Sequence, residues 1–401
     1  MRNTIISLYQ PTHLAGLVPT MQRCVERAAD AVAASADREH GDVDFSDLSL
    51  KLATDVIGQA AFGVDFGLTA ASGGGEAAEF IAEHVHSTTS LKMDLSAPLS
   101  VALGLVAPAL QGPARRLLSR VPGTADWRVA RTNARLRARL DAIVAARARG
   151  DRGGEAAAER RDFLSAVLDA RERSAALREL LTPDHVSALT YEHLLAGSAT
   201  TAFTLASAVY LVAGHPEVEA KLLDEVDRFG PPGAVPTADD LQSKFPYLDQ
   251  ASVNVIKEAM RFYTVSPLIA RVTSQQVEVG GHAFPKGTWL WMAPGALSRD
   301  ASSFPDPGAF RPERFDPASE EHRRRHPCAH IPFGVGPRAC VGQRFALQEV
   351  KLSMVHLYRR FVFRRSPRME SPPELQFGMV LSFRRGVMLV AVERQSRMPG
   401  S

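Results

Sequence analysis

Apolar residues recur at helical spacing along roughly the first two thirds of the chain. They fall three or four positions apart within residues 46–58 and again within 124–149, as on one face of an α-helix. A third pattern begins at Thr182 and Pro183 and continues for about thirty residues to Gly214, with apolar residues on most faces. We expect Thr182 to cap this helix and Pro183 to take its first position. So long and apolar a helix is predicted to cross the middle of the molecule.

After residue 267 the pattern changes to short β-type runs separated by turn-forming glycines and prolines. The further elements that the sequence predicts are helices within 217–229 and 248–262, strands within 269–272, 277–279 and 288–292, a Pro-rich irregular segment over 302–317, a last helix over 341–360 and terminal strands within 375–392. The fold class is therefore mainly α with small β-sheets. We expect one domain spanning 1–401, mainly helical over 1–266.

Composition narrows the functional classes. The chain has 401 residues, of which 45% are hydrophobic, and a net charge of +3, which is too small to indicate a nucleic-acid partner. Its three cysteines, Cys24, Cys328 and Cys340, form no CxxC pair and are too few for a disulfide framework. Residues 1–10 lack the pattern of a secretory signal. These features predict a cytoplasmic protein.

One uncharged stretch, residues 95–113, is long enough to raise the question of a membrane span. It contains Pro98 and Pro108 as well as two glycines and two serines, which suit a spanning helix poorly. We therefore predict a buried or pocket-lining pair of helices here, and no membrane span.

The densest chemical signal is the segment 332–342, which reads Pro-Phe-Gly-Val-Gly-Pro-Arg-Ala-Cys-Val-Gly. Its glycines and proline favour a compact loop, and Gly342 allows a helix to begin directly after it. Cys340 is then expected at a helix N-terminus, where the helix dipole lowers the pKa of a thiol. Phe333 is placed to shield the sulfur, and Arg338 offers a cation. An isolated cysteine in a turn is usually just a free thiol, but the pattern FxxGxRxCxG fixes five positions.

This segment resembles the haem-binding signature of the cytochrome P-450 superfamily. Two further motifs match in the expected order: Glu258 and Arg261 resemble the family's ExxR pair, and residues 310–315 resemble its PERF segment. Such a pair alone is more often solvated helix surface. In this order, the resemblance implies that Glu258, Arg261 and Arg314 form a buried ion network that holds the haem-loop region.

The resemblance also implies the cofactor. We expect haem b, with its iron ligated by the Cys340 thiolate and its edge held in the loop of Phe333, Gly334 and Gly342. The residues offered as partners for the two haem propionates are Arg338, Arg271, His330 and Arg2.

The long helical pattern contains Ala196-Gly197-Ser198-Ala199-Thr200, which resembles the family's oxygen-binding motif AGx(D/E)T. Small side chains at Ala196 and Gly197 would let the helix approach the macrocycle, and Thr200 would supply the catalytic hydroxyl. The alternative for a helical threonine is a hydrogen bond to its own preceding turn.

The motif departs from the family pattern because Ala199 stands where an acid is expected. A carboxylate there normally relays protons, a role worth roughly 10²–10⁴ in rate. Ser198, Thr201, water or the substrate could replace it, or oxygen activation could be slow and leak peroxide. Otherwise the protein could be a haem-thiolate isomerase or peroxygenase that does not use O2.

By the same resemblance, apolar residues line the substrate pocket, and residues 80–113 supply its roof. The predicted lining residues are Leu195, Ala199, Val265, Leu268, Ile269, Met379 and Val380. A small lipophilic substrate, such as a terpenoid, polyketide or fatty-acid-like molecule, fits this composition.

The resemblance is to a bacterial member of the family, and the match begins partway into the family fold. Either the gene start is placed too late, or the chain is a fragment, or the protein is naturally short. The leading hypothesis is a monomeric monooxygenase of secondary metabolism that uses O2. Electrons would come from a separate ferredoxin or flavodoxin with an NAD(P)H reductase, docked on a basic cluster of residues 323–325 with Arg344 and Lys351. The alternative for the arginine run is a solvated basic loop. The alternative outside enzymes is a non-catalytic haem-binding protein.

Overall fold

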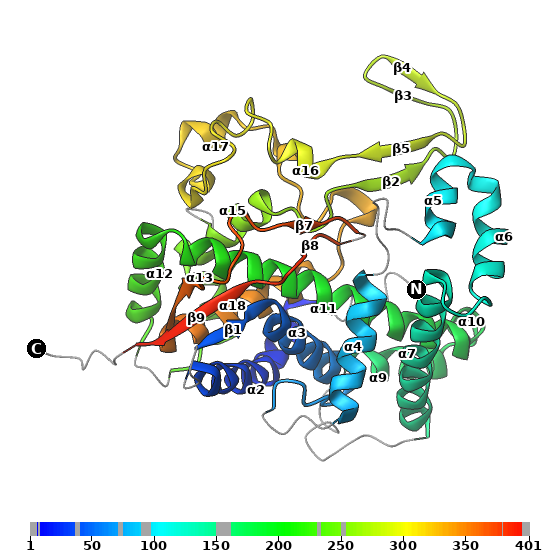
Figure 1. Ribbon diagram of the computed structural model, residues 1–401, viewed down its shortest axis with the longest axis horizontal. Helices are drawn as coiled ribbons and strands as arrows, with labels where there is room; N and C mark the ends of the chain where they lie inside the picture. The colour runs from blue at the N-terminus through cyan, green and yellow to red at the C-terminus, as the bar shows by residue number, and fades with distance from the viewer. Residues whose placement is uncertain are drawn as a thin grey trace, which may run out of the picture. The chain divides into compact units, whose positions relative to one another are not determined.

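Helices form most of the described chain, and small antiparallel sheets complete it (Figure 1). The computed structural model describes residues 6, 9–36, 41–70, 75–89, 98–149, 162–230, 234–249, 254–378 and 380–394. Internal contacts group the chain into two compact units, the first made of residues 1–245 and 341–401 and the second of residues 246–340. The expected single domain stays a prediction.

The first unit holds the long helices. Those described are α2 (Pro11–Ala36), α3 (Phe45–Phe62), α4 (Gly75–Thr89), α5 (Leu99–Val106), α6 (Pro108–Leu118), α7 (Ala125–Ala148), α9 (Phe163–Arg173), α10 (Ala175–Leu180), α11 (Pro183–Ala213), α12 (Pro216–Arg228), α13 (Ala238–Ser243) and α18 (Gln343–Arg360). The helices that the sequence predicts within 46–58, 124–149, 217–229 and 341–360 are thus confirmed.

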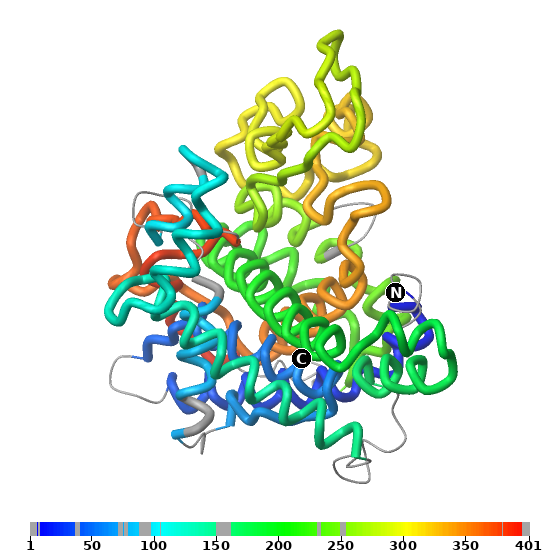
Figure 2. Tube along the Cα trace, turned by 90° about the vertical axis from the view of Figure 1, so that its right-hand side faces the viewer, coloured from blue at the N-terminus to red at the C-terminus, as the bar shows by residue number. Residues whose placement is uncertain are grey.

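The central helix α11 follows its sequence signals closely. Thr182 is its N-cap and accepts a hydrogen bond from the His185 backbone N–H, Pro183 is its first residue, and Gly214 is its C-cap. Its C-terminal half is almost wholly buried, and the helix runs through the middle of the first unit (Figure 2). By length and composition, α11 is the one helix among the described residues that could cross a membrane, and 67% of its most apolar window is buried.

A three-stranded sheet ties both ends of the described chain into the first unit. Its order is β1 (Asp42–Asp44), β9 (Met388–Glu393) and β6 (Phe361–Arg365), with both pairings antiparallel. A second, two-stranded sheet pairs β7 (Leu375–Gln376) with β8 (Ser382–Phe383). The terminal strands predicted within 375–392 are present.

The second unit is richer in turns. Its elements are α14 (Pro246–Asp249), α15 (Val255–Phe262), β2 (Ile269–Val272), β3 (Val277–Val279), β4 (His282–Phe284), β5 (Trp289–Met292), α16 (Pro294–Leu297), η1 (Pro312–Phe315), α17 (Glu320–Arg324), η2 (Pro327–Ala329) and η3 (Gly336–Arg338). Strand β2 pairs with β5, and β3 pairs with β4. The predicted strands are confirmed, whereas β4, the partner of β3, was not predicted from the sequence.

The helix predicted within 248–262 is shorter than expected. The Asn254 side chain accepts a hydrogen bond from the Lys257 backbone N–H, which makes Asn254 the N-cap of α15. This cap explains why α15 begins only at Val255. An asparagine side chain hydrogen-bonds to nearby backbone N–H groups, so asparagine is favoured at the N-cap of a helix over its interior.

Within the uncharged stretch 95–113, the predicted pair of helices is present as α5 and α6. Of the two alternatives, a buried or a pocket-lining pair, the buried one is wrong. No described residue of α6 is buried. The two helices pack mainly on each other, so their outer faces are left uncovered.

Candidate functional site

A fully buried carboxylate organises the second unit. Glu258 on α15 receives two hydrogen bonds from Arg261, at 2.8 and 2.9 Å, and one from Arg314 on η1 at 3.0 Å. The side chains of all three residues are 0% exposed. The Arg311 backbone N–H donates a further bond to Glu258, at 2.9 Å. The structure thus brings together the three residues predicted to form the ion network, and gives the buried carboxylate the complete set of partners that it requires.

The arginines of this network also hold backbone that has no regular structure. Arg261 donates to the carbonyls of Ser298, Pro307 and Ala309, at 3.0 to 3.1 Å. Arg314 donates to the carbonyl of Pro305 at 3.0 Å and to Glu321 Oε1 at 2.6 Å. Because the segment 298–311 lacks a ladder of its own, these guanidinium groups supply its backbone acceptors with donors.

Two members of the expected docking cluster are not free to meet a partner. Arg325 lies 4.2 Å above the Phe304 ring and 4.8 Å above the Phe315 ring, and it donates to the Arg314 carbonyl at 2.9 Å. Lys351 is 8% exposed and its ammonium donates to the Leu241 carbonyl. Both residues serve the packing of their own unit, which corrects this part of the prediction.

The cysteine loop has the compact geometry that its glycines predict. The Cys340 backbone N–H donates to the Phe333 carbonyl at 2.8 Å, which closes the loop. Gly334 and Gly336 have φ of +69° and +75°, a left-handed conformation that side chains other than glycine rarely adopt. The fold therefore requires glycine at these two positions.

Cys340 is exposed and forms no disulfide. Phe333 contributes its carbonyl to the closure of the loop, and the expected shielding of the sulfur by its ring stays a prediction. Helix α18 begins at Gln343 with Gly342 as its N-cap, so Cys340 precedes the cap by two residues instead of lying in the first turn. Because the thiol is exposed and the backbone that carries it is fixed, a metal ion outside the loop can reach it.

Two of the arginines predicted to hold propionates line one cavity of the second unit. Arg271 on β2 and Arg338 in the cysteine loop border a cavity of about 280 Å³ together with Ala270, Val272 and Trp289. Two cations beside an indole ring match an anionic group on a flat aromatic ligand. The donor set of this unit, one exposed cysteine and two arginines, fits a haem.

His330 does not fit the role of a propionate cation. Its ring packs on Phe315 at 4.9 Å and on Phe304 at 6.4 Å between ring centroids. Burial, with smaller contributions from Arg325, Lys257 and Arg261, lowers the pKa of His330 to about 3. The imidazole is therefore neutral near pH 7 and belongs to the aromatic core of this unit. Arg2, the fourth candidate, lies outside the described residues.

On α11, the residues of the predicted oxygen-binding motif take different environments. Thr200 donates its hydroxyl hydrogen to the Ala196 carbonyl at 2.6 Å, which is the bond to its own preceding turn. Gly197 faces α3: a Cβ at this position would lie 2.8 Å from the Ile57 side chain. The glycine is thus explained by the close packing of two helices, which corrects its expected role toward a macrocycle. Ala196 is exposed.

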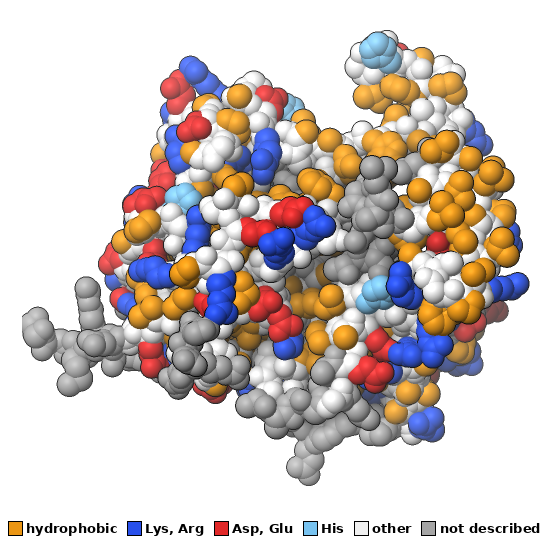
Figure 3. Space-filling model, viewed as in Figure 1, with side chains coloured by type: hydrophobic (Ala, Val, Ile, Leu, Met, Phe, Trp, Pro, Cys, Tyr) orange, Lys and Arg blue, Asp and Glu red, His pale blue; other side chains and the backbone are white. Residues whose placement is uncertain are grey.

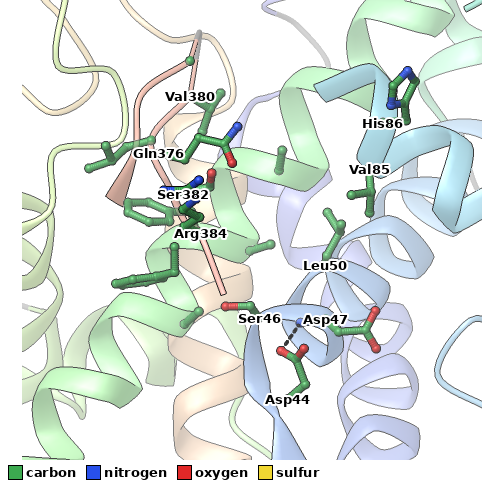
Figure 4. Close-up of a pocket in the computed structure, with 17 residues that line it drawn as sticks. Asp44, Ser46, Asp47, Leu50, Val85, His86, Gln376, Val380, Ser382 and Arg384 are labelled. Atoms are coloured by element: carbon green, nitrogen blue, oxygen red, sulfur yellow. Dashed lines mark hydrogen bonds between the residues drawn. The ribbon is translucent and has the colours of Figure 1, made fainter. Parts of the chain in front are cut away.

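The first unit contains a larger cavity, of about 580 Å³, beside α11 (Figure 4). It includes Ala199 and Val380 from the predicted pocket. The other lining residues come from the start of α3, from α4, from α11 and from the β7–β8 hairpin; they are Asp44, Ser46, Asp47, Leu50, Val85, His86, Ala202, Phe203, Ala206, Gln376, Gly378, Leu381, Ser382, Phe383 and Arg384. The α11 wall is apolar.

The polar side chains of this cavity are unevenly placed. Figure 4 shows Asp44, Ser46 and Asp47 together at one end, with Arg384 and His86 farther along the walls. Asp44 caps α3 by accepting from the Asp47 backbone N–H at 3.0 Å, and burial raises the pKa of Asp44. These residues were missed because a cap signal in the sequence carries no information about a neighbouring cavity.

The remaining residues of the predicted pocket are placed as follows. Leu195 on α11 is partly buried and does not line the cavity of the first unit. Val265, Leu268 and Ile269 belong to the second unit, before and at the start of β2, where Leu268 is exposed. Met379 lies outside the described residues.

One buried polar pair on α11 was not foreseen. His84 Nε2 on α4 lies 2.6 Å from Ser198 Oγ, and Ser198 in turn donates to the Leu194 carbonyl at 2.6 Å. Both residues are 0% exposed, and burial lowers the pKa of His84 to about 4. The pair links α4 to α11. No sequence motif joins two residues so far apart in the chain.

The sequence of this chain matches a known protein family and is similar to known proteins. The family model described as Cytochrome P450 matches residues 1–390. Thromboxane-A synthase of Macaca fascicularis is 34% identical over 274 residues, which cover 61% of this chain and 50% of the relative. Cytochrome P450 3A14 of Cavia porcellus is 33% identical over 244 residues, covering 61% of this chain and 47% of the relative. The chain thus spans about half the length of these mammalian proteins, and they give no support to a bacterial assignment.

Proposed function

Because the chain belongs to the cytochrome P450 family, we propose that it is a haem-thiolate monooxygenase that inserts one oxygen atom from O2 into a small lipophilic substrate. The observation that carries the proposal is the cysteine loop, in which a hydrogen bond to Phe333 and two left-handed glycines fix the backbone beside an exposed Cys340 thiol. Members of the family bind haem through such a thiolate, and Cys340 is the proposed ligand.

When bound, haem b supplies the redox chemistry, and the protein supplies binding and orientation. Arg271 and Arg338 would neutralise the propionates with charge-assisted hydrogen bonds. The Glu258 network keeps the irregular backbone at 298–311 in place.

The cavity of the first unit supports the proposed substrate class. Its volume of about 580 Å³ lies within the range of ligand pockets, and Ala199, Ala202 and Phe203 give it an apolar wall. A terpenoid, polyketide or fatty-acid-like molecule suits such a wall, and secondary metabolism is the proposed setting. Electrons would come from a separate ferredoxin or flavodoxin with an NAD(P)H reductase. The proposed location is the cytoplasm, as a monomer.

A second candidate function rests on α11. Ala199 provides no carboxylate, and Thr200 already donates its hydroxyl hydrogen to Ala196. Ser198 donates its hydroxyl hydrogen to the Leu194 carbonyl, so the proton supply expected of a monooxygenase would come from Thr201, water or substrate. A haem-thiolate isomerase or a peroxygenase does not activate O2, so it needs no such supply of protons. One of the similar proteins is named a synthase.

The absorption spectrum of the purified, dithionite-reduced protein with carbon monoxide tests the shared premise. A strongly red-shifted Soret band is expected, because the thiolate of Cys340 ligates the iron. Cys340→Ala should abolish that shift, whereas Cys328→Ala, the other exposed cysteine, should leave it unchanged. A histidine-type band in the unaltered protein would refute the proposed ligation.

Turnover separates the two candidate functions. A monooxygenase forms product with O2 and a reductase system, whereas a peroxygenase needs only peroxide and an isomerase needs neither. Under O2, Thr200→Ala should keep the haem but release peroxide in place of product. Thr204→Ala is the matched control, because Thr204 makes the same kind of bond to its preceding turn. Normal coupled turnover by Thr200→Ala would remove this hydroxyl from the mechanism.

A further inference from the structure

Two hydrogen bonds join α4 to α11 behind the walls of the cavity in the first unit. His84 on α4 contacts Ser198 on α11, with 2.6 Å between Nε2 and Oγ. About one helical turn later, the Ser87 hydroxyl of α4 lies 2.9 Å from the Tyr191 hydroxyl of α11. The second contact lies later on α4 and earlier on α11, so the two helices run in opposite directions here. We call these four residues the α4–α11 seam.

The hydrogens of the α4–α11 seam have defined directions. Ser198 donates its hydroxyl hydrogen to its own preceding turn, so His84 donates the Nε2–H of its ring to Ser198. Ser87 donates its hydrogen to Asn133 Oδ1 on α7 at 2.8 Å, so Tyr191 donates to Ser87. Burial lowers the pKa of His84 to about 4 and raises the pKa of Tyr191, so both groups are neutral near pH 7.

The α4–α11 seam brackets the part of α4 that lines the cavity. The lining residues of α4 are Val85 and His86, which lie between the two seam positions of this helix (Figure 4). On α11, the lining residue Ala199 directly follows the seam residue Ser198. The seam residues themselves do not line the cavity, but each holds the backbone beside a residue that does.

Helix α4 depends on the α4–α11 seam for its position beside α11. It packs mainly on α7 and has few contacts with α11 among the described residues. His84 and Ser198 are both 0% exposed, and a buried polar group that loses its partner is costly. Buried polar contacts between helices also specify one arrangement of them. The seam therefore favours a single distance between the two helices.

The surface above the cavity is chemically mixed, whereas its inner walls are largely apolar. Over α4 and the β7–β8 hairpin, Figure 3 shows acidic and basic side chains beside hydrophobic ones. The apolar lining residues of the two helices include Val85, Ala199, Ala202 and Phe203. Because apolar contact is non-directional, such walls select a ligand by the width of the space between them.

We propose that the α4–α11 seam fixes the width of the cavity between α4 and α11 and thereby limits the breadth of the lipophilic substrate. The inference rests on the proposed function, in which this cavity takes the substrate. It deepens that function by assigning specificity to positioning residues that do not touch the ligand. A narrow, flexible molecule fits between fixed walls, whereas a broad, rigid ring system needs walls that separate.

The test compares two probes by isothermal titration calorimetry on the haem-loaded protein. The narrow probe is 1-decanol and the broad one is progesterone. The unaltered protein should bind 1-decanol more tightly. In Ser198→Ala, the ratio of the progesterone to the 1-decanol dissociation constant should fall about fivefold, the contribution of one hydrogen bond. Ser207→Ala is the matched control, because the Ser207 hydroxyl makes the same bond to its preceding turn on α11 and should leave the ratio unchanged.

Further variants separate positioning from a general loss of structure. Tyr191→Phe keeps the ring, deletes only the hydroxyl that donates to Ser87, and should lower the same ratio. His84→Leu should lower it too, whereas His84→Gln, whose amide can donate to Ser198, should restore most of it. His84→Leu and Ser198→Ala should not be additive, because both break one contact. Circular dichroism and the Tm of each variant verify that it is folded.

Two sets of results would overturn the proposal, and they are distinguishable. If Ser198→Ala and Tyr191→Phe lower the Tm but leave the ratio of dissociation constants unchanged, the α4–α11 seam is structural only, and the proposed function stands. If neither probe binds the unaltered haem-loaded protein, the cavity is not a site for lipophilic substrates, and this part of the proposed function fails together with the inference.

Discussion

At the scale of single residues, the second unit depends on one carboxylate. Glu258 holds two guanidinium groups and one backbone N–H, and all three ionised side chains are withdrawn from water. Removing one partner from such a set leaves charges buried without compensation, which is far more costly than losing an exposed pair.

Glu258→Gln is therefore expected to lower the free energy of unfolding by about 3–5 kcal/mol. Glu320→Gln is the matched control, because Glu320 pairs with Arg324 on the exposed surface of α17 and such a pair is worth about 0–1 kcal/mol. Urea denaturation followed by circular dichroism measures both. Equal losses in the two variants would contradict the assigned role of Glu258.

The buried His330 makes the free energy of unfolding depend on pH in the acidic range. Its pKa is lowered to about 3 in the folded chain, so the unfolded chain binds more protons at any pH between about 3 and 6.5. The stability that the neutral ring contributes is fully present above pH 6.5 and is lost as the pH falls below that value.

The free energy of unfolding should thus decrease from pH 6.5 to 5. His330→Leu, which keeps an apolar group against Phe315, should reduce that decrease by about 1–2 kcal/mol. His282→Leu, on the exposed strand β4, is the control and should leave the decrease as it is. Denaturation curves at several pH values provide the measurement, and identical slopes for the His330 variant and the unaltered protein would refute this account.

At the scale of elements, the close approach of α11 to α3 depends on one glycine, Gly197. Gly197 leaves room for the Ile57 side chain, and any larger residue must displace it. The sequence motif indicates a small residue here but not which neighbour requires it, because the partner lies far away in the chain.

Gly197→Ala is expected to cost about 1–3 kcal/mol through overpacking. Gly16→Ala on α2 is the matched control: space around Gly16 is open, so the better helix propensity of alanine should stabilise by about 0.5–1 kcal/mol. Gly197→Ala should cost less in the Ile57→Ala background than in the unaltered protein, since the clash is gone. A double-mutant cycle without coupling would exclude the proposed contact.

At the scale of the whole molecule, haem should act as a ligand of the folded state. A group bound by the folded chain alone raises stability by mass action. We expect a higher Tm for the haem-loaded protein than for the haem-free protein, a difference that Cys340→Ala removes or strongly reduces and Cys328→Ala preserves. Differential scanning calorimetry measures the difference. The same increase in the Cys340 variant would show that haem is held without this thiolate.

Much of the fold could be predicted from the sequence, because its signals are local. The caps at Thr182 and Gly214 and the turn glycines act on their own backbone, so the elements beside them follow from short patterns. The ion network was implied by resemblance. The cavity beside Asp44, the pair of His84 with Ser198 and the neutral His330 depend on neighbours distant in sequence, which no local pattern specifies.

The sheet of the first unit has a consequence for synthesis. Strand β1 at residues 42–44 pairs with β9, whose first residue follows more than 340 residues later. At typical elongation rates of about 5–20 residues per second, β1 waits roughly 20 s to 1 min on the ribosome before its partner exists. Through that interval the apolar side chains of α2 and α3 lack the last helix and the last strand that cover them, which makes the nascent chain a natural client of chaperones.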